Sequence, residues 1–232
     1  MKIFNEFGIK PTTNCKAAGY DFYIPNIQKP VEECGFILEA FSKSYNLSLE
    51  QLNDCLAYLE LQVSSVYGAD KWEGQEMNIL FLFLALDSDY VKESENAVET
   101  FVDDCLIFDK DGKPGIKPCI PDHVFFNSGI HVALNPGTAG IFFNKSGRGI
   151  KGWDVRAQVV DEDYSGLVHL SLAYTKNNLE DGVIYVGDKI TQMVIVKIEN
   201  GDVEDIDRET YMALMSNSER GDKGFGSSNE KH

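Results

Sequence analysis

The spacing of apolar residues divides this chain into three zones. Residues 1–28 are short and mixed, and they end in a turn-like Ile-Pro-Asn run. Residues 29–121 place apolar side chains at intervals of three and four, the spacing typical of amphipathic helices. Residues 122–232 contain short runs of branched and aromatic residues separated by Gly, Asn, Pro and Asp, which indicates short strands and turns. We therefore expect a helical block followed by many strands.

Within the helical zone, one helix start and one buried element stand out. Ser48 precedes an amphipathic run and Gln51 follows three residues later, which is the spacing of a capping box. Residues 91–106 repeat the same helical period. Residues 77–86 are apolar on all sides, which predicts a buried element but leaves open whether it is a helix or a strand.

The third zone predicts a β-rich fold. The expected strands include residues 124–126, 130–134, 141–143 and 193–196. Many short strands at this spacing favour a closed barrel or jelly roll over a fold built from βαβ units. The tail from Ser216 onward is rich in Gly, Ser and charge, and we expect it to be mobile unless a ligand orders it.

Charge and hydropathy narrow the classes of partner. The 232 residues carry a formal net charge of −16 at pH 7, which disfavours both nucleic acid and an anionic membrane surface as partners. Eighteen of the acidic residues, with six lysines, lie in residues 30–121, so most of the negative charge belongs to the helical zone. The longest apolar run, residues 79–86, is too short to cross a bilayer. Since the first residues carry no apolar signal core, we expect a cytoplasmic protein.

Cysteine and histidine positions suggest no metal centre. The five cysteines are scattered and form no CxxC pair, so we expect reduced thiols rather than a disulfide framework or a zinc site. Three histidines lie in the expected strands, and we interpret them as packed or surface residues rather than ligands: His123, His131 and His169.

Three segments carry residue types suited to phosphate chemistry. Residues 145–149 form a glycine loop with a hydroxyl and two cations, and residues 220–228 combine cations, glycines, hydroxyls and one aromatic. Glycine lets backbone N–H groups approach an anion, and Arg and hydroxyl groups donate to phosphate. Residues 161–163 are three consecutive acids, for which a metal site, a catalytic carboxylate and a solvated turn all remain open. No Walker-type spacing is present, which excludes a P-loop NTPase.

Five short segments, taken in order, resemble the signature motifs of the trimeric dUTPase family, the dUTP diphosphatases. In chain order they are Ala18-Gly19-Tyr20-Asp21-Phe22, Lys145-Ser146-Gly147-Arg148-Gly149, Val160-Asp161-Glu162-Asp163-Tyr164-Ser165-Gly166, Gly187-Asp188-Lys189-Ile190-Thr191-Gln192-Met193, and Arg220 to Ser227. The resemblance covers residues 1–28 and 122–232. It implies a mainly β fold, a distorted dUTPase-like jelly-roll β-barrel with a C-terminal arm that carries motif five. Residues 29–121 would then be an α-helical insertion between motifs one and two.

The resemblance also implies a reaction, hydrolysis of dUTP to dUMP and diphosphate, which limits uracil in DNA and supplies dUMP for dTMP synthesis. By the family pattern Asp161 is the base that activates water for attack on the α-phosphorus. Tyr164 packs on the deoxyribose, main-chain groups of residues 155–160 read uracil, and Phe225 stacks on the base when the arm closes. By the same pattern, the substrate-binding residues are Lys145, Ser146, Gly147, Tyr164, Gln192, Arg220, Phe225, Gly226 and Ser227, supported by Asp21 and Asp163.

Cofactor and assembly follow from the same resemblance. Mg²⁺ is expected to bind through the triphosphate and water, with no protein cage of carboxylates. A homotrimer with shared sites is expected, in which one subunit supplies motifs one, two and four, a second supplies motif three and a third supplies motif five. Four positions depart from the family pattern: Lys145 for Arg, Lys223 and Asn229 for Gly, and Val155 where an Asn often stands.

Two alternatives to dUTP hydrolysis remain. One is a dCTP deaminase-like or bifunctional nucleotide enzyme, whose arginine–serine-rich motif two and catalytic Glu near motif three fit this sequence less well. The other is a nucleotide-sensing regulatory protein acting through the helical insertion. We expect residues 29–121 either to pack on the barrel as an elaboration or to bind a protein partner. A second, all-helical dUTPase is rejected, because the ExxE pattern at residues 73–76 has no ExxD after it in this zone.

Overall fold

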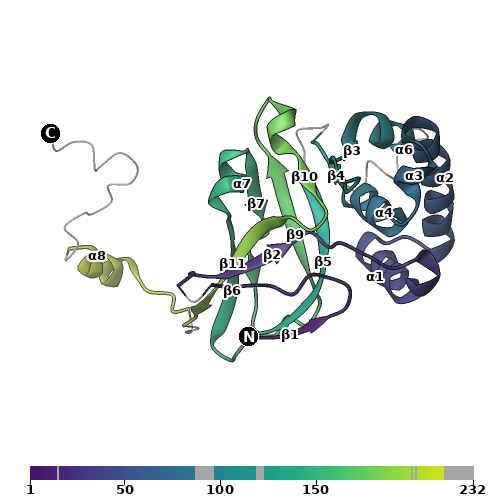
Figure 1. The fold of residues 1–232 in the computed structure, drawn as a ribbon. Coiled ribbons are helices and arrows are strands. Elements are labelled where there is room, and N and C mark those ends of the chain that lie inside the picture. The colour runs from purple at the N-terminus through teal and green to yellow at the C-terminus, as the bar shows by residue number, and fades with distance from the viewer. Residues whose placement is uncertain (15, 87–96, 119–122, 200, 202, 217–232) are drawn as a thin grey trace. The chain divides into compact units, whose positions relative to one another are not determined.

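The computed structural model describes residues 1–14, 16–86, 97–118, 123–199, 201 and 203–216. It divides into two compact units, Met1–Ile198 and Glu199–His232. The first unit contains the sheets and the packed helices, as Figure 1 shows. Among the described residues, the second unit contains helix α8 (Arg208–Ser216).

Two antiparallel four-stranded sheets form most of the β part of the first unit within the described residues, with strand orders β1-β5-β9-β7 and β2-β11-β6-β8. The strands of the first sheet are β1 (Lys2–Asn5), β5 (His123–Ala133), β7 (Trp153–Arg156) and β9 (Leu167–Tyr174). The strands of the second are β2 (Tyr20–Tyr23), β6 (Thr138–Asn144), β8 (Val159–Val160) and β11 (Lys189–Lys197). The expected β-rich fold with helical additions is confirmed: these strands contain the four runs predicted above, except that β5 ends at Ala133, one residue before the end of the run 130–134.

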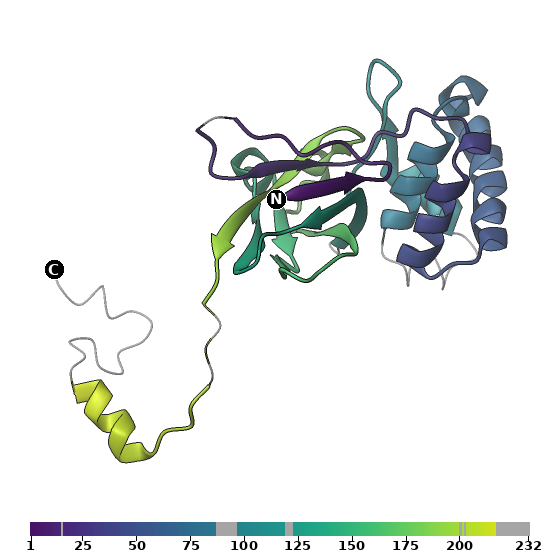
Figure 2. The same cartoon turned by 90° about the horizontal axis from the view of Figure 1, so that it is seen from below.

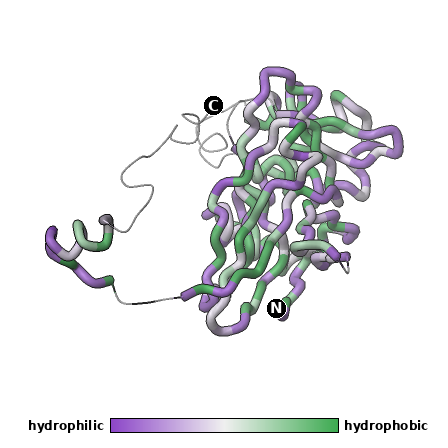
Figure 3. Tube along the Cα trace, turned by 90° about the vertical axis from the view of Figure 1, so that its left-hand side faces the viewer, coloured by the Kyte–Doolittle hydropathy of each residue, from purple (hydrophilic) through white to green (hydrophobic). Residues whose placement is uncertain are grey.

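The two sheets enclose an apolar core. Strand β9 alternates between buried and partly exposed residues along its whole length, the two-residue period of a strand with one face on a core. Phe22 of β2 and Phe142 of β6 pack edge to face with ring centroids 5.0 Å apart. Figure 3 shows hydrophobic stretches running through the interior of the unit and hydrophilic segments at its turns.

Helices cover one side of the β part, as Figure 2 shows from below. Their bounds are α1 (Gly35–Tyr45), α2 (Leu49–Tyr67), α3 (Ala69–Trp72), α4 (Glu76–Ala85), α6 (Ala97–Thr100) and the π-helix Phe101–Cys105, with 3₁₀ turns at Val31–Glu33 and Leu179–Gly182. The predicted capping box at the start of α2 is confirmed. Ser48 Oγ accepts from the Gln51 N–H at 3.1 Å, and Gln51 Oε1 accepts from the Ser48 N–H at 2.8 Å. Residues 91–96 of the second predicted helical run lie outside the described residues.

Residues 77–85 of the apolar run belong to helix α4, which settles the choice that the sequence left open. Each of its residues from Met77 to Ala85 is buried. The Phe81 ring lies 5.7 Å from Phe41 of α1 and 5.6 Å from Phe126 of β5, measured between centroids. Because α4 lies between the other helices and the sheet, it has no solvent face and its sequence shows no amphipathic period.

One polar residue on α4 ties the helix to the chain that leaves β2. Asn78 is fully buried. Its Oδ1 accepts from the Ile27 N–H at 2.7 Å, and its Nδ2 donates to the Ile27 carbonyl at 3.2 Å and to Gln75 Oε1 at 2.9 Å. Asn78 thus replaces the hydrogen bonds that the buried Ile27 backbone would otherwise lack.

Helix α1 attaches to strand β5 through its last turn. Tyr45 Oη donates to the Phe125 carbonyl at 3.1 Å, and Asn127 Nδ2 donates to Ser44 Oγ at 2.6 Å. The buried residues of the helices and of both sheets form one hydrophobic cluster. The helices are therefore packed as part of the first unit.

The zone that we expected to be helical ends in strands. Strands β3 (Leu106–Phe108) and β4 (Pro114–Ile116) pair with each other, and β4 also pairs with β10 (Ile184–Tyr185). Gly115 suits this pairing, because a Cβ there would lie 2.5 Å from the Ile184 carbonyl oxygen. The strand propensities of individual residues do not reveal which distant segments pair, so the sequence did not predict this pairing.

The cysteines only partly follow the reduced-thiol expectation. Cys34 and Cys55 are free thiols, and burial raises the pKa of both. Cys105 is disulfide-bonded, which differs from that expectation. In the part of the chain that the structure describes, no helix has the length and apolar character needed to span a membrane.

We predict that Asn78→Ala lowers the free energy of unfolding by about 2–4 kcal/mol, because both backbone polar groups of the buried Ile27 lose their partners. Asn53→Ala is the matched control, since Asn53 is exposed on α2 and its removal should change stability by no more than about 0.5 kcal/mol. Urea unfolding followed by circular dichroism measures both variants. Equal stability of the two would contradict the role assigned to Asn78.

Candidate active site

The acidic segment after β8 forms a compact turn. The Tyr164 N–H donates to the Asp161 carbonyl at 3.2 Å, and Tyr164 Oη donates to the Leu167 carbonyl at 2.6 Å. Asp161, Asp163 and Tyr164 are all exposed. The phenol ring folds back over the chain, and Gly166 leaves room for it.

Asp161 and Tyr164 line one pocket of about 160 Å³. The lining comes from both sheets and from the hairpin between β7 and β8: Phe125, Phe142, Ala157, Val159, Val160, Asp161, Tyr164, Val168 and His169. The structure therefore brings the predicted base and the predicted sugar platform together. It also places part of the predicted uracil-reading segment, residues 155–160, against the same space.

The tip of that hairpin is strained. Ala157 has φ +48°, in the left-handed region that side chains with a Cβ rarely adopt. The Gln158 carbonyl accepts from the Phe142 N–H at 2.8 Å, so the tip is tied to β6. Backbone strain of this kind persists where the surrounding structure holds it, and it is common at ligand sites.

Two contacts hold the acidic turn from outside. The Gly137 N–H donates to Glu162 Oε2, which joins the turn to the β5–β6 hairpin. His131 of β5 contacts the Ser165 carbonyl through Nδ1 at 2.9 Å and Glu6 Oε2 through Nε2 at 3.2 Å. These positioning residues were not predicted as such, because their partners lie far away in sequence.

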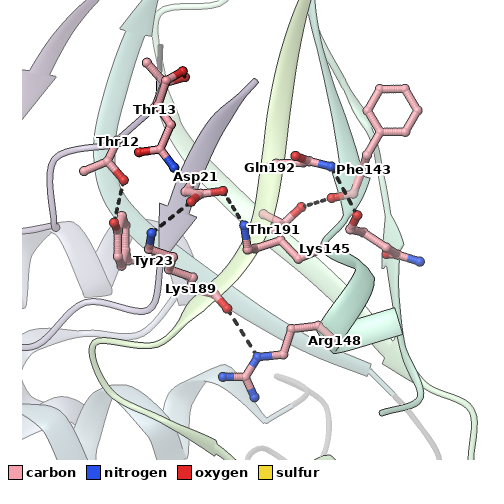
Figure 4. A network of polar contacts seen from close by, with 12 residues as sticks. Thr12, Thr13, Asp21, Tyr23, Phe143, Lys145, Arg148, Lys189, Thr191 and Gln192 are labelled. Carbon is pink, nitrogen blue, oxygen red and sulfur yellow. Dashed lines mark hydrogen bonds and ion pairs between the residues drawn. The ribbon is translucent and has the colours of Figure 1, made fainter. Parts of the chain in front are cut away.

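A second cluster is centred on Asp21 of β2 (Figure 4). Asp21 Oδ1 lies 2.5 Å from Lys145 Nζ, and Asp21 Oδ2 lies 3.1 Å from Lys189 Nζ. Burial alone would raise the pKa of Asp21, but the hydrogen bonds and charges of the two lysines outweigh it and hold the pKa below its usual value. This carboxylate stays ionised and already has two cationic partners, so it suits a structural role.

Motif two begins helix α7 (Ser146–Ile150), with Lys145 at its N-cap. The N-cap side chain makes no capping hydrogen bond. Since the first turn of a helix leaves backbone N–H groups without intrahelical partners, the exposed Ser146 and Gly147 present donors there.

Arg148 fastens α7 to the loop that precedes β11. Its guanidinium donates to Asp188 Oδ2 at 2.6 Å, to the Val183 carbonyl at 3.1 Å and to the Lys189 carbonyl at 3.2 Å. Neither Arg148 nor Lys189 was among the predicted site residues, although both lie inside the motifs. The sequence signal that could have identified them was a cationic side chain inside a motif, which would need an acidic partner.

Strand β11 brings three motifs into register. Gln192 pairs with Asp21 of β2 on one side and with Phe143 of β6 on the other, and its Nε2 donates to the Asn144 carbonyl at 3.4 Å. Motifs one, two and four therefore meet at one place within a single chain.

The two clusters are separate within one chain. No hydrogen bond or ion pair among the described residues joins the turn at residues 161–166 to the cluster of Asp21, Lys145 and Gln192. The predicted motif-five residues lie outside the described residues: Arg220, Phe225, Gly226 and Ser227.

The described residues do not form a cage for a cation. No group of three or more His, Cys, Asp or Glu side chains among them is arranged to hold a metal ion. Asp21 already forms ion pairs with two lysines. Asp161, in contrast, is an acidic residue that lines the pocket.

Part of this chain is similar to known sequences. The family model described as dUTPase matches residues 115–229, which include motifs two to five but neither motif one nor most of the helical zone. Deoxyuridine 5'-triphosphate nucleotidohydrolase of Candida albicans is 36% identical over 99 residues, which cover 42% of this chain and 58% of that protein. The Rattus norvegicus protein of the same name is 35% identical over 100 residues, covering 42% of this chain and 44% of that protein. The chain thus spans about half the length of these curated relatives.

Solved structures give a weaker likeness. The dUTPase of Staphylococcus bacteriophage 80alpha with dUPNHPP aligns at 19% identity and a TM-score of 0.38, covering 53% of this chain and 89% of that chain. A mutant dUTPase from phage phi11 of S. aureus, described with a structural Mg(II) ion, aligns at 16% identity and a TM-score of 0.34, covering 40% of this chain and 76% of that chain. Scores this low carry no argument of their own.

The sequence matches and the order of the motifs are the stronger findings. Four of the five motifs lie inside the matched region, and the fifth, around Asp21, is hydrogen-bonded to motifs two and four. Residues 115–229 of this chain are thus identified as a dUTPase-family region.

Proposed function

We propose that this protein hydrolyses dUTP to dUMP and diphosphate. The observation that carries the proposal is the pocket that Asp161 and Tyr164 share with the β7–β8 hairpin. A carboxylate, an aromatic platform and a strained main-chain segment around one small apolar space suit a nucleoside whose phosphate must meet an activated water. The choice of dUTP as the substrate rests on the names of the relatives, deoxyuridine 5'-triphosphate nucleotidohydrolase.

Asp161 takes the catalytic role. A neutral water molecule is a weak nucleophile, and a carboxylate that accepts its proton during attack on the α-phosphorus contributes typically ~10²–10⁴-fold. Asp161 is exposed, so water reaches it. The diphosphate leaves with the electron pair of the broken P–O bond.

The second cluster binds the charged part of the substrate. Ser146 and Gly147 present a hydroxyl and backbone donors at the start of α7, and Gln192 presents its amide beside them. Charge that develops on the phosphoryl oxygens is met by such fixed donors. The Asp21–Lys145–Lys189 contacts hold the elements that carry these donors, and the motif-five residues Arg220, Phe225, Gly226 and Ser227 complete the site as an arm.

A complete site requires more than one copy of the chain. Within the described part of one subunit, no hydrogen bond or ion pair joins the pocket at Asp161 to the donors at α7. We propose a homotrimer in which the pocket of one subunit faces the α7 donors of its neighbour, and the arm comes from a third subunit.

A magnesium ion would be held mainly by the substrate rather than by this chain. The described residues do not form a cage for the ion, so its ligands would be triphosphate oxygens and water. When bound, the ion neutralises charge on the triphosphate, and the remaining steps are performed by the residues above.

The helical zone is proposed to be an elaboration of the barrel. Its buried residues share one hydrophobic cluster with the sheets, and α4 packs directly on β5. That continuity favours a packed elaboration over an independently folded binding module. A protein partner would have to bind its exposed acidic surface, such as the outer face of α2.

Asp161→Asn is predicted to reduce turnover of dUTP by about 10²–10⁴-fold, because the amide cannot accept the proton of water. Binding of a non-hydrolysable dUTP analogue should stay within a few-fold of wild type, as calorimetry would show. Asp54→Asn, on the exposed face of α2, is the control and should match wild type. Diphosphate release from dUTP measures activity, and ammonia release from dCTP tests the deaminase alternative. Near-normal hydrolysis by Asp161→Asn would refute the assignment of the base.

Mixing two inactive variants tests whether the sites are shared. Asp161→Asn and Gln192→Ala should each be inactive alone, yet co-expressed copies with different tags should regain activity in mixed trimers. If each site takes these residues from different subunits, random assembly restores about a quarter of the sites. Hybrid trimers purified through both tags and as inactive as the single variants would exclude that arrangement.

Gly166→Ala is predicted to disturb the sugar platform. A Cβ at Gly166 would lie 2.6 Å from Tyr164 Oη, so the phenol must move away from its bond to the Leu167 carbonyl. We expect the preference for dUTP over UTP, measured as a ratio of kcat/KM values, to fall by about tenfold. Gly35→Ala is the matched control, because a Cβ there meets nothing within 4 Å. An unchanged preference would argue against Tyr164 as the group that senses the 2′ position.

A further inference from the structure

His131 of β5 connects two segments that are far apart in the sequence. Its Nδ1 lies 2.9 Å from the Ser165 carbonyl oxygen, in the turn that also carries Asp161. Its Nε2 lies 3.2 Å from Glu6 Oε2, one residue beyond the end of β1. The ring therefore ties the acidic turn to the strand at the edge of the first sheet.

The sheet determines where this ring can reach. His131 pairs in register with Phe4 of β1 on one side and with Leu167 of β9 on the other. The Phe4 ring lies beside the imidazole, with centroids 5.5 Å apart and an angle of 43° between the planes. The His131 and Glu6 side chains are only 28% and 25% exposed. Since water reaches these polar groups only in part, their hydrogen bonds have to be made within the protein.

Both partners of the ring can only accept hydrogen bonds. A carbonyl oxygen has no proton to donate, and a carboxylate has none either. A neutral imidazole has one N–H and one lone pair, so it can donate to one of the two oxygens and must turn its lone pair toward the other. The imidazolium has an N–H on each nitrogen and can donate to both oxygens. The two contacts are therefore complete only when the ring is charged.

The titratable groups around the ring are acids. Glu6 faces it from the segment after β1, and the turn that it contacts contains Asp161, Glu162 and Asp163. Its register partner on β9, Leu167, is apolar. A hydrogen bond between a cation and a carboxylate is roughly twice as strong as a neutral one. A charged ring thus holds both segments more firmly than a neutral ring does.

We propose that His131 is a positioning residue that acts as an imidazolium and holds the turn with Asp161 against Glu6. The inference rests on the proposed function, because it takes Asp161 as the base that activates water. When the ring gives its proton to solvent, one of its two hydrogen bonds is lost and Asp161 is aimed less precisely at the water. Turnover of dUTP is then expected to fall as the pH rises through the range in which histidine loses its charge.

Two variants of His131 separate its charge from its bulk. His131→Arg keeps a cation at every pH, whereas His131→Gln is neutral and has donors on one nitrogen only. We expect the ratio of wild-type kcat to His131→Arg kcat to fall by about tenfold between about pH 6 and about pH 9. His131→Gln should have a kcat about tenfold below wild type at about pH 6, with KM nearly unchanged. Ionisation of the substrate cancels in these ratios.

His123→Gln is the matched control. His123 is exposed at the start of β5, on the same strand as His131. Its replacement should leave kcat, KM and the pH dependence of turnover at wild-type values.

Two measurements on the protein without substrate separate this inference from the proposed function. In protein labelled with ¹⁵N-histidine, both ring nitrogens of His131 should be protonated at about pH 6, and the loss of one proton should coincide with the fall in turnover. The Tyr164 N–H, which donates to the Asp161 carbonyl, should exchange with solvent faster in His131→Gln than in His131→Arg at the same pH. If the protein fails to hydrolyse dUTP, the proposed function falls, and these measurements still decide whether the charged ring holds the turn.

Two results would overturn the inference while leaving dUTP hydrolysis intact. One is a wild-type ring that has a single N–H already at about pH 6. The other is a His131→Gln protein whose kcat and Tyr164 exchange rate equal those of His131→Arg over the whole pH range. In either case the contacts of His131 do not require its charge.

Discussion

Strand β11 pairs with β2 along one edge and with β6 along the other, and the arrangement of the candidate site depends on this double pairing. Backbone hydrogen bonds fix the register, so Gln192 lies beside Asp21 and close to the end of β6 where α7 begins. A shift of one residue would turn Gln192 to the opposite face of the sheet. The ion pairs of Asp21 with Lys145 and Lys189 then hold side chains whose positions the sheet has already set.

The pocket at Asp161 is built on a different principle. Its walls are apolar side chains of both sheets, and its polar groups come from turns: the acidic turn after β8 and the strained hairpin tip at Ala157. Turns tolerate unusual backbone angles because fewer hydrogen bonds constrain them. Contacts from Gly137 and His131 supply the rigidity that the turn itself lacks. The proposed site thus has two parts: side chains positioned by the register of the sheet, and a turn held in place by contacts from neighbouring segments.

Sequence reasoning identified the elements whose signals are local. The capping box at Ser48, the strand runs around Phe126 and Phe142, and the ordered motifs could all be read from a few neighbouring residues. Helix α4 could be predicted as buried but not as helical, because enclosure on all sides removes the amphipathic period. Strands β3 and β4 and the contacts of His131 depend on partners far away in the chain, which single-sequence patterns do not reveal. His169 was interpreted as a packed or surface residue, and its ring stacks on Phe125, a partner that is visible only in three dimensions.

The attachment of the helices has a consequence for how the chain folds. Asn78 bonds to Ile27 across 51 positions, and Tyr45 bonds to Phe125 across 80. Contacts between residues so distant in sequence raise the contact order, and chains with high contact order fold slowly because long loops must close before the contacts form. Strand β5 completes its packing only when α1 and α4 have reached it, so the helices and the first sheet are expected to reach their final packing together.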